Sequence, residues 1–378
     1  MPPAKGHSAF RSEIIDRLGE SRAWPLPGGT ILLPRVFGFC RGVTRALEML
    51  EKALDDPAST GKRFFLLGPI IHNPWVNRHF ERRGVRILSR PQMQHLSSLL
   101  SPDDRAVVPT FGAAPPIEET LRRIGCPVID TTCPDVRRLW AWARRAAQDG
   151  RGVLIYGRTD HDETLVTKAH LEASGGFYAV VGNLEEAREF CRMVSSSEDS
   201  RSPAAAFGPG TSNAPTMEPF LRLAQVSQTT MLYEETTQVR DLLRAAFEGR
   251  FGSAGAADRL LLQPTVCRAT QDRQTAAREL CESGCDLIVV VGGFGSSNTR
   301  HLYELALRRG SAHFIEDASA VLGAGSIRSL DAGTGAVREV AGWLPSRRPL
   351  RIGVLAGASS PEAVVGQVLE KLAELLQA

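Results

Sequence analysis

Three cysteines lie where an extended segment is followed by an amphipathic helical pattern. Cys40, Cys133 and Cys267 occur in PRVFGFCRGVTRALEMLEKAL, CPVIDTTCPDVRRLWAWARRAA and QPTVCRATQDRQTAARELC. A helix N-terminus presents unpaired amides and partial positive charge, which favours a thiolate. Three thiolates from separate βα units can meet at the carboxyl ends of their sheets, so the pattern indicates one shared metal centre.

The spacing of the cysteines indicates which metal this centre would hold. None of the seven cysteines forms the CxxC pair that is typical of structural zinc sites. Three soft thiolates far apart in sequence suit a 4Fe-4S cluster in which one iron lacks a protein ligand and can act as a Lewis acid. Cys281 and Cys285 are interpreted as bystanders because Gly284 interrupts their helix. For any single cysteine, a buried structural thiol is the alternative.

Two glycine-serine turns follow strong strand patterns. LIVVVGGFGSSNTRHLYELAL contains Ser296, Ser297 and Asn298, and IGVLAGASSPEAVVGQVLEKL contains Ser359, each just before a predicted helix. Hydroxyls, free amides and the helix dipole all favour an anion there, so both turns are candidate phosphate sites. Ordinary helix capping by serine is the alternative.

Polar residues after other strands could handle protons. His161 and Glu163 in HDET follow the strand GVLIYG, and a carboxylic acid placed there could protonate a leaving hydroxyl or a carbon centre. His72 in GPIIHNP could donate to phosphate, and Thr229 lies in SQTTML. Hydrogen-bonded loop histidines and a capping threonine remain the alternatives.

The elements that must position these residues alternate along the chain. We expect strands at RFFLLG, RAVVPTF, CPVID, GVLIYG, FYAVVG, DLIVVVGG and LRIGVLAG, with helical patterns between them. Such alternation predicts an α/β fold with mostly parallel sheets. Residues 192–216 are rich in Ser, Pro, Gly and Ala without periodicity, which predicts a mobile surface insertion.

Composition excludes several classes of protein. Of the 378 residues 43% are hydrophobic, and Lys plus Arg exceed Asp plus Glu by three (45 against 42). No basic patch typical of nucleic-acid binding stands out, and no apolar run reaches the length of a signal peptide or membrane span. We therefore expect a soluble, cytoplasmic protein without nucleic-acid or membrane partners.

The motifs taken together resemble a known family. GFCRGVTRA, GPIIHNPWVN, VIDTTCPDV, HDET, SQTTML, CRATQDRQ, VVGGFGSSNTRHL and AGASSPE, in this order, resemble 4-hydroxy-3-methylbut-2-enyl diphosphate reductase from about Leu33 to Leu372. VVPTFGAAP and the block ending in WLP are similar to the plant and cyanobacterial branch. The family catalyses the last step of non-mevalonate isoprenoid biosynthesis.

The resemblance implies a trefoil of three α/β domains around a central 4Fe-4S cluster. The predicted parts are an N-terminal arm, 1–29, expected to be poorly ordered; a first domain, 30–133, to which 346–378 return; a second, 134–262, with the insertion 192–216; and a third, 263–345.

The resemblance to this family also implies roles for the candidate residues. Cys40, Cys133 and Cys267 would hold the cluster. The diphosphate would lie against His72, Ser296, Ser297, Asn298 and Ser359, with His161 close by. Thr229 and Glu163 would orient the allylic hydroxyl and deliver the proton. The products would be isopentenyl and dimethylallyl diphosphate, and a ferredoxin or flavodoxin would supply electrons.

Four positions depart from the family pattern, and one of them is Arg268, directly after Cys267. Phe111 replaces a phosphate-binding histidine of common bacterial members, Gly295 replaces the usual Asn, and Leu355 replaces the usual Thr. These changes keep two alternatives open: a diverged relative acting on another phosphorylated allylic alcohol, and a cluster-bearing redox sensor without turnover. A sensor would not need Glu163, which argues against the second.

Overall fold

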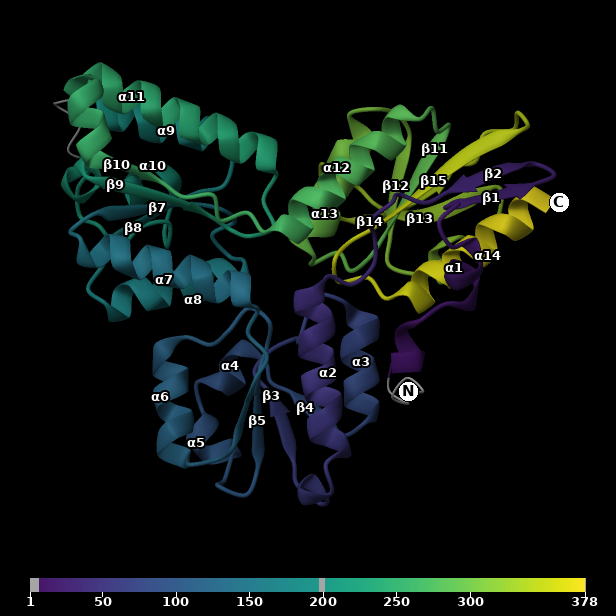
Figure 1. Ribbon diagram of the computed structural model, residues 1–378, viewed down its shortest axis with the longest axis horizontal. Coiled ribbons are helices and arrows are strands. Elements are labelled where there is room, and N and C mark those ends of the chain that lie inside the picture. Colours follow the sequence, from purple (N-terminus) through teal and green to yellow (C-terminus); the bar gives the residue numbers. More distant parts are fainter. Residues whose placement is uncertain (1–6, 197–200, 378) are drawn as a thin grey trace. The chain divides into compact units, whose positions relative to one another are not determined.

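The structure is a computed structural model that describes residues 7–196 and 201–377 (Figure 1). Residues 1–6 of the predicted arm and 197–200 of the predicted insertion lie outside the described residues. The chain forms two compact units. Unit 1 comprises Met1–Gly61, Pro69–Ile87 and Arg268–Ala378, and unit 2 comprises Lys62–Gly68 and Leu88–Cys267. Within the described ranges no helix combines the length and the apolarity that crossing a membrane requires.

Unit 1 is built on a five-stranded sheet of order β1-β2-β15-β11-β12. Strands β2, β15, β11 and β12 are parallel, and β1 is antiparallel to β2. The elements of this unit are η1 (His7–Phe10), α1 (Glu13–Leu18), β1 (Ala23–Leu26), β2 (Gly29–Leu32), α2 (Arg41–Asp55), η2 (Pro57–Ser59), α3 (Pro74–Arg82), β4 (Val85–Ile87), α12 (Arg268–Glu282), β11 (Leu287–Val291), α13 (Ser297–Leu307), β12 (Ala312–Ile315), η4 (Ala318–Ala320), the antiparallel hairpin β13 (Ser326–Leu330) and β14 (Val337–Ala341), β15 (Leu350–Ala356) and α14 (Glu362–Gln377).

Helices cover both faces of this sheet, as Figure 1 shows for α12 and α13 on one face and α14 on the other. Every residue of β11 is buried, because its continuous LIVVV run packs against helices on both sides. Leu369 and Leu372 of α14 belong to one core cluster, and Leu302 and Ala306 of α13 belong to the other.

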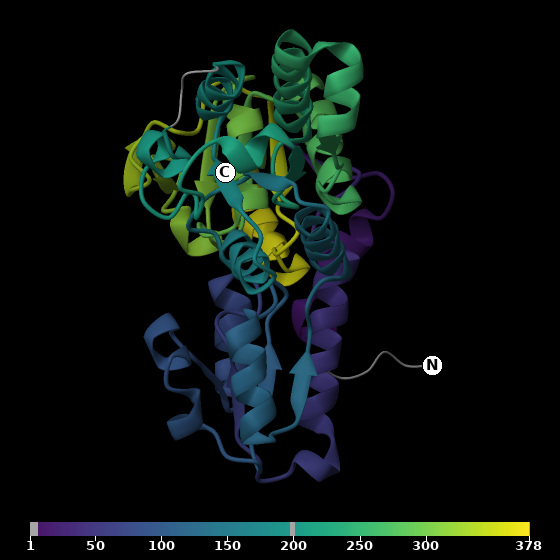
Figure 2. The ribbon, with the colours of Figure 1, turned by 90° about the vertical axis from the view of Figure 1, so that its left-hand side faces the viewer.

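The N-terminal segment has more regular structure than we expected from sequence. Ile14 and Ile15 of α1 are buried in the same core cluster as α14, and β1 pairs with β2. Two adjacent isoleucines and one pairing strand are enough to order this segment, although they form no long periodic pattern. Figure 2 shows α2 as a long straight helix; its buried stripe of Val43, Ala46, Leu47 and Leu50 matches the predicted stripe.

Unit 2 contains a four-stranded parallel sheet, β10-β9-β7-β8, and the parallel strands β3, β5 and β6. Its elements are β3 (Phe64–Leu66), α4 (Arg90–Met93), α5 (Leu96–Leu99), β5 (Arg105–Val108), α6 (Pro115–Ile124), β6 (Val128–Asp130), α7 (Pro134–Gln148), β7 (Gly152–Tyr156), α8 (Asp162–Ala173), β8 (Tyr178–Val181), α9 (Leu184–Ser195), α10 (Pro203–Phe207), η3 (Glu218–Leu221), β9 (Leu223–Ser227), α11 (Tyr233–Arg259) and β10 (Leu260–Leu262).

The four-stranded sheet of unit 2 lies between two pairs of helices. Helices α9 and α11 cover one face, and α7 and α8 cover the other (Figures 1 and 2). In the predicted insertion, residues 203–207 form α10, and Ser212 Oγ donates to the Tyr178 carbonyl of β8 at 2.6 Å. These described parts of the insertion are therefore attached to the sheet.

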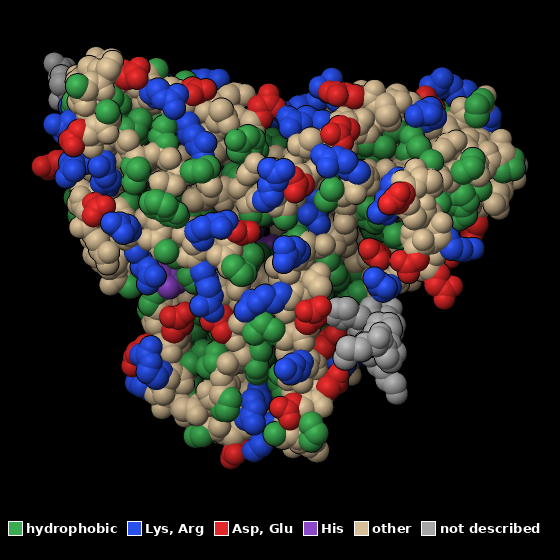
Figure 3. All heavy atoms as spheres, in the orientation of Figure 1, with side chains coloured by type: hydrophobic (Ala, Val, Ile, Leu, Met, Phe, Trp, Pro, Cys, Tyr) green, Lys and Arg blue, Asp and Glu red, His purple; other side chains and the backbone are tan. Residues whose placement is uncertain are grey.

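The predicted fold class is confirmed, since all seven predicted strands are present and the sheets are mostly parallel. The three-domain boundaries and the trefoil arrangement stay predictions. The β13–β14 hairpin was not predicted, because β14 is largely exposed and lacks an apolar run. Basic and acidic side chains are interspersed over the face shown in Figure 3, in agreement with the small net charge.

Candidate functional site

Four predicted site residues of unit 2 follow the carboxyl ends of neighbouring parallel strands. His161 and Glu163 follow β7, Thr229 follows β9, and Cys267 follows β10. Parallel strands end at a common edge of the sheet, which is where α/β proteins bind ligands.

Glu163 and Thr229 are joined by two hydrogen bonds. The Thr229 amide donates to Glu163 Oε1 at 2.6 Å, and Thr229 Oγ1 donates to Oε2 at 2.7 Å. The Thr229 carbonyl in turn accepts from the Cys267 amide at 3.0 Å. One short chain of bonds therefore connects the predicted proton donor to a predicted cluster ligand.

Glu163 is almost completely buried, with 2% of the residue exposed. Burial disfavours its charged form and raises its pKa to about 7; the two bonds from Thr229 oppose this shift, and the negative charge of Asp135 adds to it. A carboxyl group with such a pKa holds its proton near neutral pH and can act as a general acid.

His161 is the N-cap of α8. Its Nδ1 accepts from the Glu163 amide at 3.2 Å, so the neutral imidazole carries its proton on Nε2 and can donate from there. The ring of Phe111 lies edge-on to the imidazole, with 5.7 Å between centroids. Phe111 therefore orients His161 and adds no charge.

Unit 1 brings together a second set of predicted residues. Strands β2, β15 and β11 are consecutive and parallel, and their carboxyl ends lead to Cys40, Ser359 and Ser296 respectively. Cys40 is the N-cap of α2, and its Sγ accepts from the Val43 amide at 3.5 Å.

The two serine turns touch each other. Ser296 Oγ accepts from the Thr299 amide at 3.3 Å and is hydrogen-bonded to the hydroxyls of Thr299 and Ser359, at 2.9 and 3.2 Å. A hydroxyl oxygen has two lone pairs, so the Ser296 hydrogen serves one of the two hydroxyl bonds. This approach requires glycine at position 357, because a Cβ there would lie 1.9 Å from Thr299 Oγ1.

Ser297 and Asn298 have unsatisfied polar groups. Each side chain is 3% exposed, and neither Ser297 Oγ nor either polar atom of Asn298 has a hydrogen-bond partner among the described residues. Buried polar atoms normally have partners, so these atoms point to a polar ligand.

His72 lies beside the same turn. Cβ atoms built on Gly293 and Gly295 would lie 2.3 Å from the His72 carbonyl oxygen and 3.8 Å from His72 Cβ respectively. Gly295 therefore leaves space next to the imidazole that a larger residue would fill. Leu355, in contrast, is a buried core residue of β15.

The three predicted ligand cysteines share a backbone arrangement that sequence reasoning missed. The amides of Cys40, Cys133 and Cys267 donate to the carbonyls of Ala358, Thr110 and Thr229, at 3.3, 3.0 and 3.0 Å. Each acceptor follows the parallel strand next to the one that precedes the cysteine. A backbone acceptor can belong to any residue type, so no pattern in the sequence could have marked it.

The other four cysteines differ from these three. Burial raises the pKa of the thiols of Cys126 and Cys285, that of Cys281 to about 11 and that of Cys191 to about 12. Such thiols are poor ligands and nucleophiles. Cys40, Cys133 and Cys267 are partly exposed and form no disulfide, and each directly precedes a helix, a position that favours a thiolate.

The candidate residues thus form two sets. We call Cys40, His72, Ser296, Ser297, Asn298 and Ser359 of unit 1 the serine half-site, and Cys133, His161, Glu163, Thr229 and Cys267 of unit 2 the glutamate half-site. In neither unit taken by itself do the described residues form a group of three His, Cys, Asp or Glu side chains suited to a metal ion.

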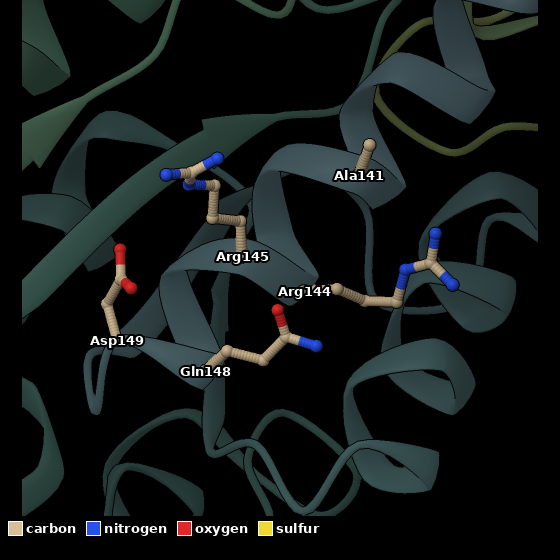
Figure 4. A pocket seen from close by; sticks show the side chains of 5 residues that line it. All are labelled: Ala141, Arg144, Arg145, Gln148 and Asp149. Carbon is tan, nitrogen blue, oxygen red and sulfur yellow. The ribbon is translucent and has the colours of Figure 1, made fainter.

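A surface depression lies elsewhere, on the second half of α7. It is lined by Ala141, Arg144, Arg145, Gln148 and Asp149, none of which is a predicted site residue. Figure 4 shows Arg144 and Arg145 extending to opposite sides of the helix, so their charges do not converge on one ligand.

The chain matches the LytB protein family over residues 31–373. The chain belongs to the LytB family. LytB relatives named 4-hydroxy-3-methylbut-2-enyl diphosphate reductase include one from Gloeobacter violaceus, 34% identical over 356 residues (92% of this chain and 83% of that relative). Another, from Synechococcus sp., is 34% identical over 371 residues (97% and 91%). This confirms the predicted family, and the cyanobacterial relatives agree with the predicted branch.

Solved LytB structures share the fold. A structure of (E)-4-hydroxy-3-methyl-but-2-enyl diphosphate reductase, described as the terminal enzyme of the non-mevalonate pathway, has a TM-score of 0.54 at 25% identity and covers 91% of this chain and 99% of that one. The Plasmodium falciparum E-1-hydroxy-2-methyl-but-2-enyl-4-diphosphate reductase has a TM-score of 0.64 at 21% identity and covers 92% and 88%.

Proposed function

We propose that this LytB protein is a cytoplasmic iron-sulfur reductase that converts 4-hydroxy-3-methylbut-2-enyl diphosphate into isopentenyl and dimethylallyl diphosphate. The net change removes the allylic hydroxyl as water and consumes two electrons and two protons. The observation that carries the proposal is the pair Glu163 and Thr229, in which a buried acid with a pKa of about 7 is bonded to a threonine that also holds the Cys267 amide.

In this proposal the serine half-site binds the diphosphate. The unsatisfied hydroxyl of Ser297 and amide nitrogen of Asn298 suit phosphate oxygens, and Ser296 would donate once a ligand replaces one of its present hydroxyl bonds. The N-terminus of α13 adds partial positive charge at the same place. His72 and His161 would supply further donors, and Ser359 would donate once its hydroxyl turns from Ser296 to the ligand.

Three cysteines would hold a 4Fe-4S cluster, since the donor set fits. Cys40, Cys133 and Cys267 are partly exposed soft ligands at helix N-termini, and their amides are fixed by neighbouring carbonyls. When bound, such a cluster supplies electrons one at a time and a Lewis-acidic iron that lacks a protein ligand. An external protein, such as a ferredoxin or flavodoxin, would reduce it.

Glu163 would supply the proton that leaves with the hydroxyl as water. Its burial keeps the proton bound up to about pH 7, and Thr229 contacts both carboxyl oxygens, which fixes the orientation of the group. A second proton reaches either end of the allyl group, which accounts for two products.

The decisive experiment is turnover by anaerobically reconstituted protein with a chemical reductant. We expect the wild type to consume 4-hydroxy-3-methylbut-2-enyl diphosphate. Glu163→Gln should lower kcat at least about a hundredfold, as the loss of a general acid does, while the absorbance and EPR spectra stay unchanged. Glu185→Gln, at an exposed position in the first turn of α9, is the matched control.

Other results of this experiment would support one of the two alternative functions. Because Gly295 leaves space beside His72, turnover of a different phosphorylated allylic alcohol in a substrate panel would favour the diverged relative. A cluster-bearing wild type that turns over nothing would favour the redox sensor. An unaffected rate for Glu163→Gln would remove the role assigned to this acid.

A further inference from the structure

Helix α12 contains a buried arginine that the proposed function does not use. Arg273 is 5% exposed. Its Nη2 donates to the Gly38 carbonyl at 2.7 Å, and its Nη1 donates to the Ala269 carbonyl, one turn earlier in the helix, at 2.9 Å. Burying a guanidinium is costly, so its hydrogen bonds must be maintained for the unit to stay folded around it.

The carbonyl that Arg273 holds lies two residues before Cys40. On the other side of this segment, the Cys40 amide donates to the Ala358 carbonyl at 3.3 Å, and the Cys40 carbonyl accepts from the Thr44 amide at 2.9 Å as α2 begins. The backbone from Gly38 to Cys40 is therefore held between α12 and the turn that contains Ser359.

A second arginine also links α12 to the segment before Cys40, but this contact is exposed to solvent. Arg35 Nε donates to Glu279 Oε2 of α12 at 2.8 Å, and the two side chains are 56% and 54% exposed. Exposed ion pairs contribute little because water and salt screen them. Of these two links, the buried one therefore contributes more to the position of residues 35–38.

We propose that Arg273 is a positioning residue for Cys40, and that it fixes the backbone which presents the Cys40 thiol. An arginine is needed because its planar fork bonds two carbonyls at once, one on its own helix and one on the segment. The positioning of the Cys40 thiol by Arg273 does not depend on the proposed function. Only the role of that thiol in holding a cluster rests on that function.

The first test uses metal-free protein and measures alkylation of each cysteine by iodoacetamide, followed by peptide mass spectrometry. Removing one hydrogen bond from a charged donor should raise local opening at Cys40 and its alkylation rate about tenfold in Arg273→Gln. Arg273→Lys keeps the positive charge and one donor nitrogen. Its alkylation rate at Cys40 should therefore fall between those of the wild type and of Arg273→Gln. Arg35→Gln, at the exposed link, should match the wild type, and the rate at the buried Cys126 serves as the internal reference for global unfolding.

An unchanged Cys40 rate in a folded Arg273→Gln protein would overturn the proposal. If Arg273→Gln does not fold, the Arg273→Lys variant is used for the test. A wild-type alkylation rate at Cys40 together with wild-type hydrogen exchange of the Cys40 amide would overturn the proposal. Faster alkylation and exchange confined to residues near Cys40 would support it.

The second test counts iron per chain after anaerobic reconstitution and follows iron loss to a chelator. Arg273→Gln should lose iron about tenfold faster than Arg35→Gln, for the same loss of one charge-assisted bond. Equal rates of loss would contradict the role toward a cluster. If the wild-type protein binds no iron after reconstitution, the proposed function is wrong. The positioning role of Arg273 would still be tested by alkylation, because that test needs no metal.

Discussion

The proton of Glu163 is controlled by two opposing influences. Burial of the side chain favours the neutral acid, whereas the amide and hydroxyl of Thr229 favour the carboxylate, and burial is the larger of the two. In an unfolded chain the same carboxyl group would ionise at its ordinary pKa, close to 4.5. The fold therefore determines when this residue carries a proton, and the residue type alone does not.

This difference makes a prediction for the stability of metal-free protein. Because the folded pKa is raised, the contribution of Glu163 to stability is fully present below about pH 4.5 and is lost as pH rises through about 7. From pH 5 to pH 8, Glu163→Gln should therefore gain roughly 3 kcal/mol in free energy of unfolding relative to the wild type. Urea unfolding at both pH values measures this gain.

The control for this prediction is Glu185→Gln, whose free energy of unfolding relative to the wild type should not change with pH. A Glu163→Gln difference that is equal at pH 5 and pH 8 would show that the carboxyl group ionises normally in the folded protein.

At the scale of elements, the segment after β5 is held on three sides. The Thr110 carbonyl accepts from the Cys133 amide, the Phe111 ring lies against His161, and Gly112 packs beneath Trp140. Trp140, in turn, lies 4.2 Å from the His170 ring between centroids. The segment after β5 therefore packs against α7 on one side and contacts two residues of the glutamate half-site, Cys133 and His161, on the other.

Gly112 is the most constrained residue of this segment. Its φ is +86°, and a Cβ there would lie 2.0 Å from Trp140 Cη2. Gly125 has a similar φ of +77°, but no atom lies within 4 Å of the position that a Cβ would take there. Gly125→Ala should cost about 1 kcal/mol for backbone strain alone, whereas Gly112→Ala should cost about 2 kcal/mol more because of overpacking.

Thermal and urea unfolding of the two alanine variants compare these costs directly. Equal destabilisation at both positions would show that Trp140 moves aside freely and that the segment is not held from this side.

At the scale of the whole molecule, the candidate residues are divided between two units. Cys40 and the serine turns belong to unit 1, and Cys133, Cys267 and Glu163 belong to unit 2. Under the proposed function, neither unit carries all three of the candidate thiolates that a cubane with three protein ligands needs. Cluster binding would then depend on the entire chain.

The corresponding prediction concerns iron. Cys40→Ser in unit 1 and Cys267→Ser in unit 2 should each reduce the iron bound per chain to a small fraction of the wild-type amount, because two thiolates hold a cubane poorly. Cys285→Ser, at a partly buried cysteine of unit 1 outside the half-site, should retain it. Iron assays and EPR after anaerobic reconstitution measure this, and full iron in Cys40→Ser would exclude a cluster shared by the two units.

By itself, the sequence was sufficient to predict seven strands, the helices after Cys40, Cys133 and Cys267, the parallel sheets and the family. These features depend on local patterns: apolar runs such as LIVVV, the helical stripe of α2, and residue types at the ends of strands. Family membership depends on short motifs whose order along the chain is itself part of the sequence.

Only the tertiary structure decided the raised pKa of Glu163, the carbonyls that hold the three cysteine amides, the contact of Gly112 with Trp140 and the bond from Arg273 to Gly38. Arg273 and Gly38 are 235 residues apart, and Thr229 and Glu163 are 66 apart. Burial and hydrogen bonding between such distant residues are determined by how the elements pack, and no local pattern of residue types records them.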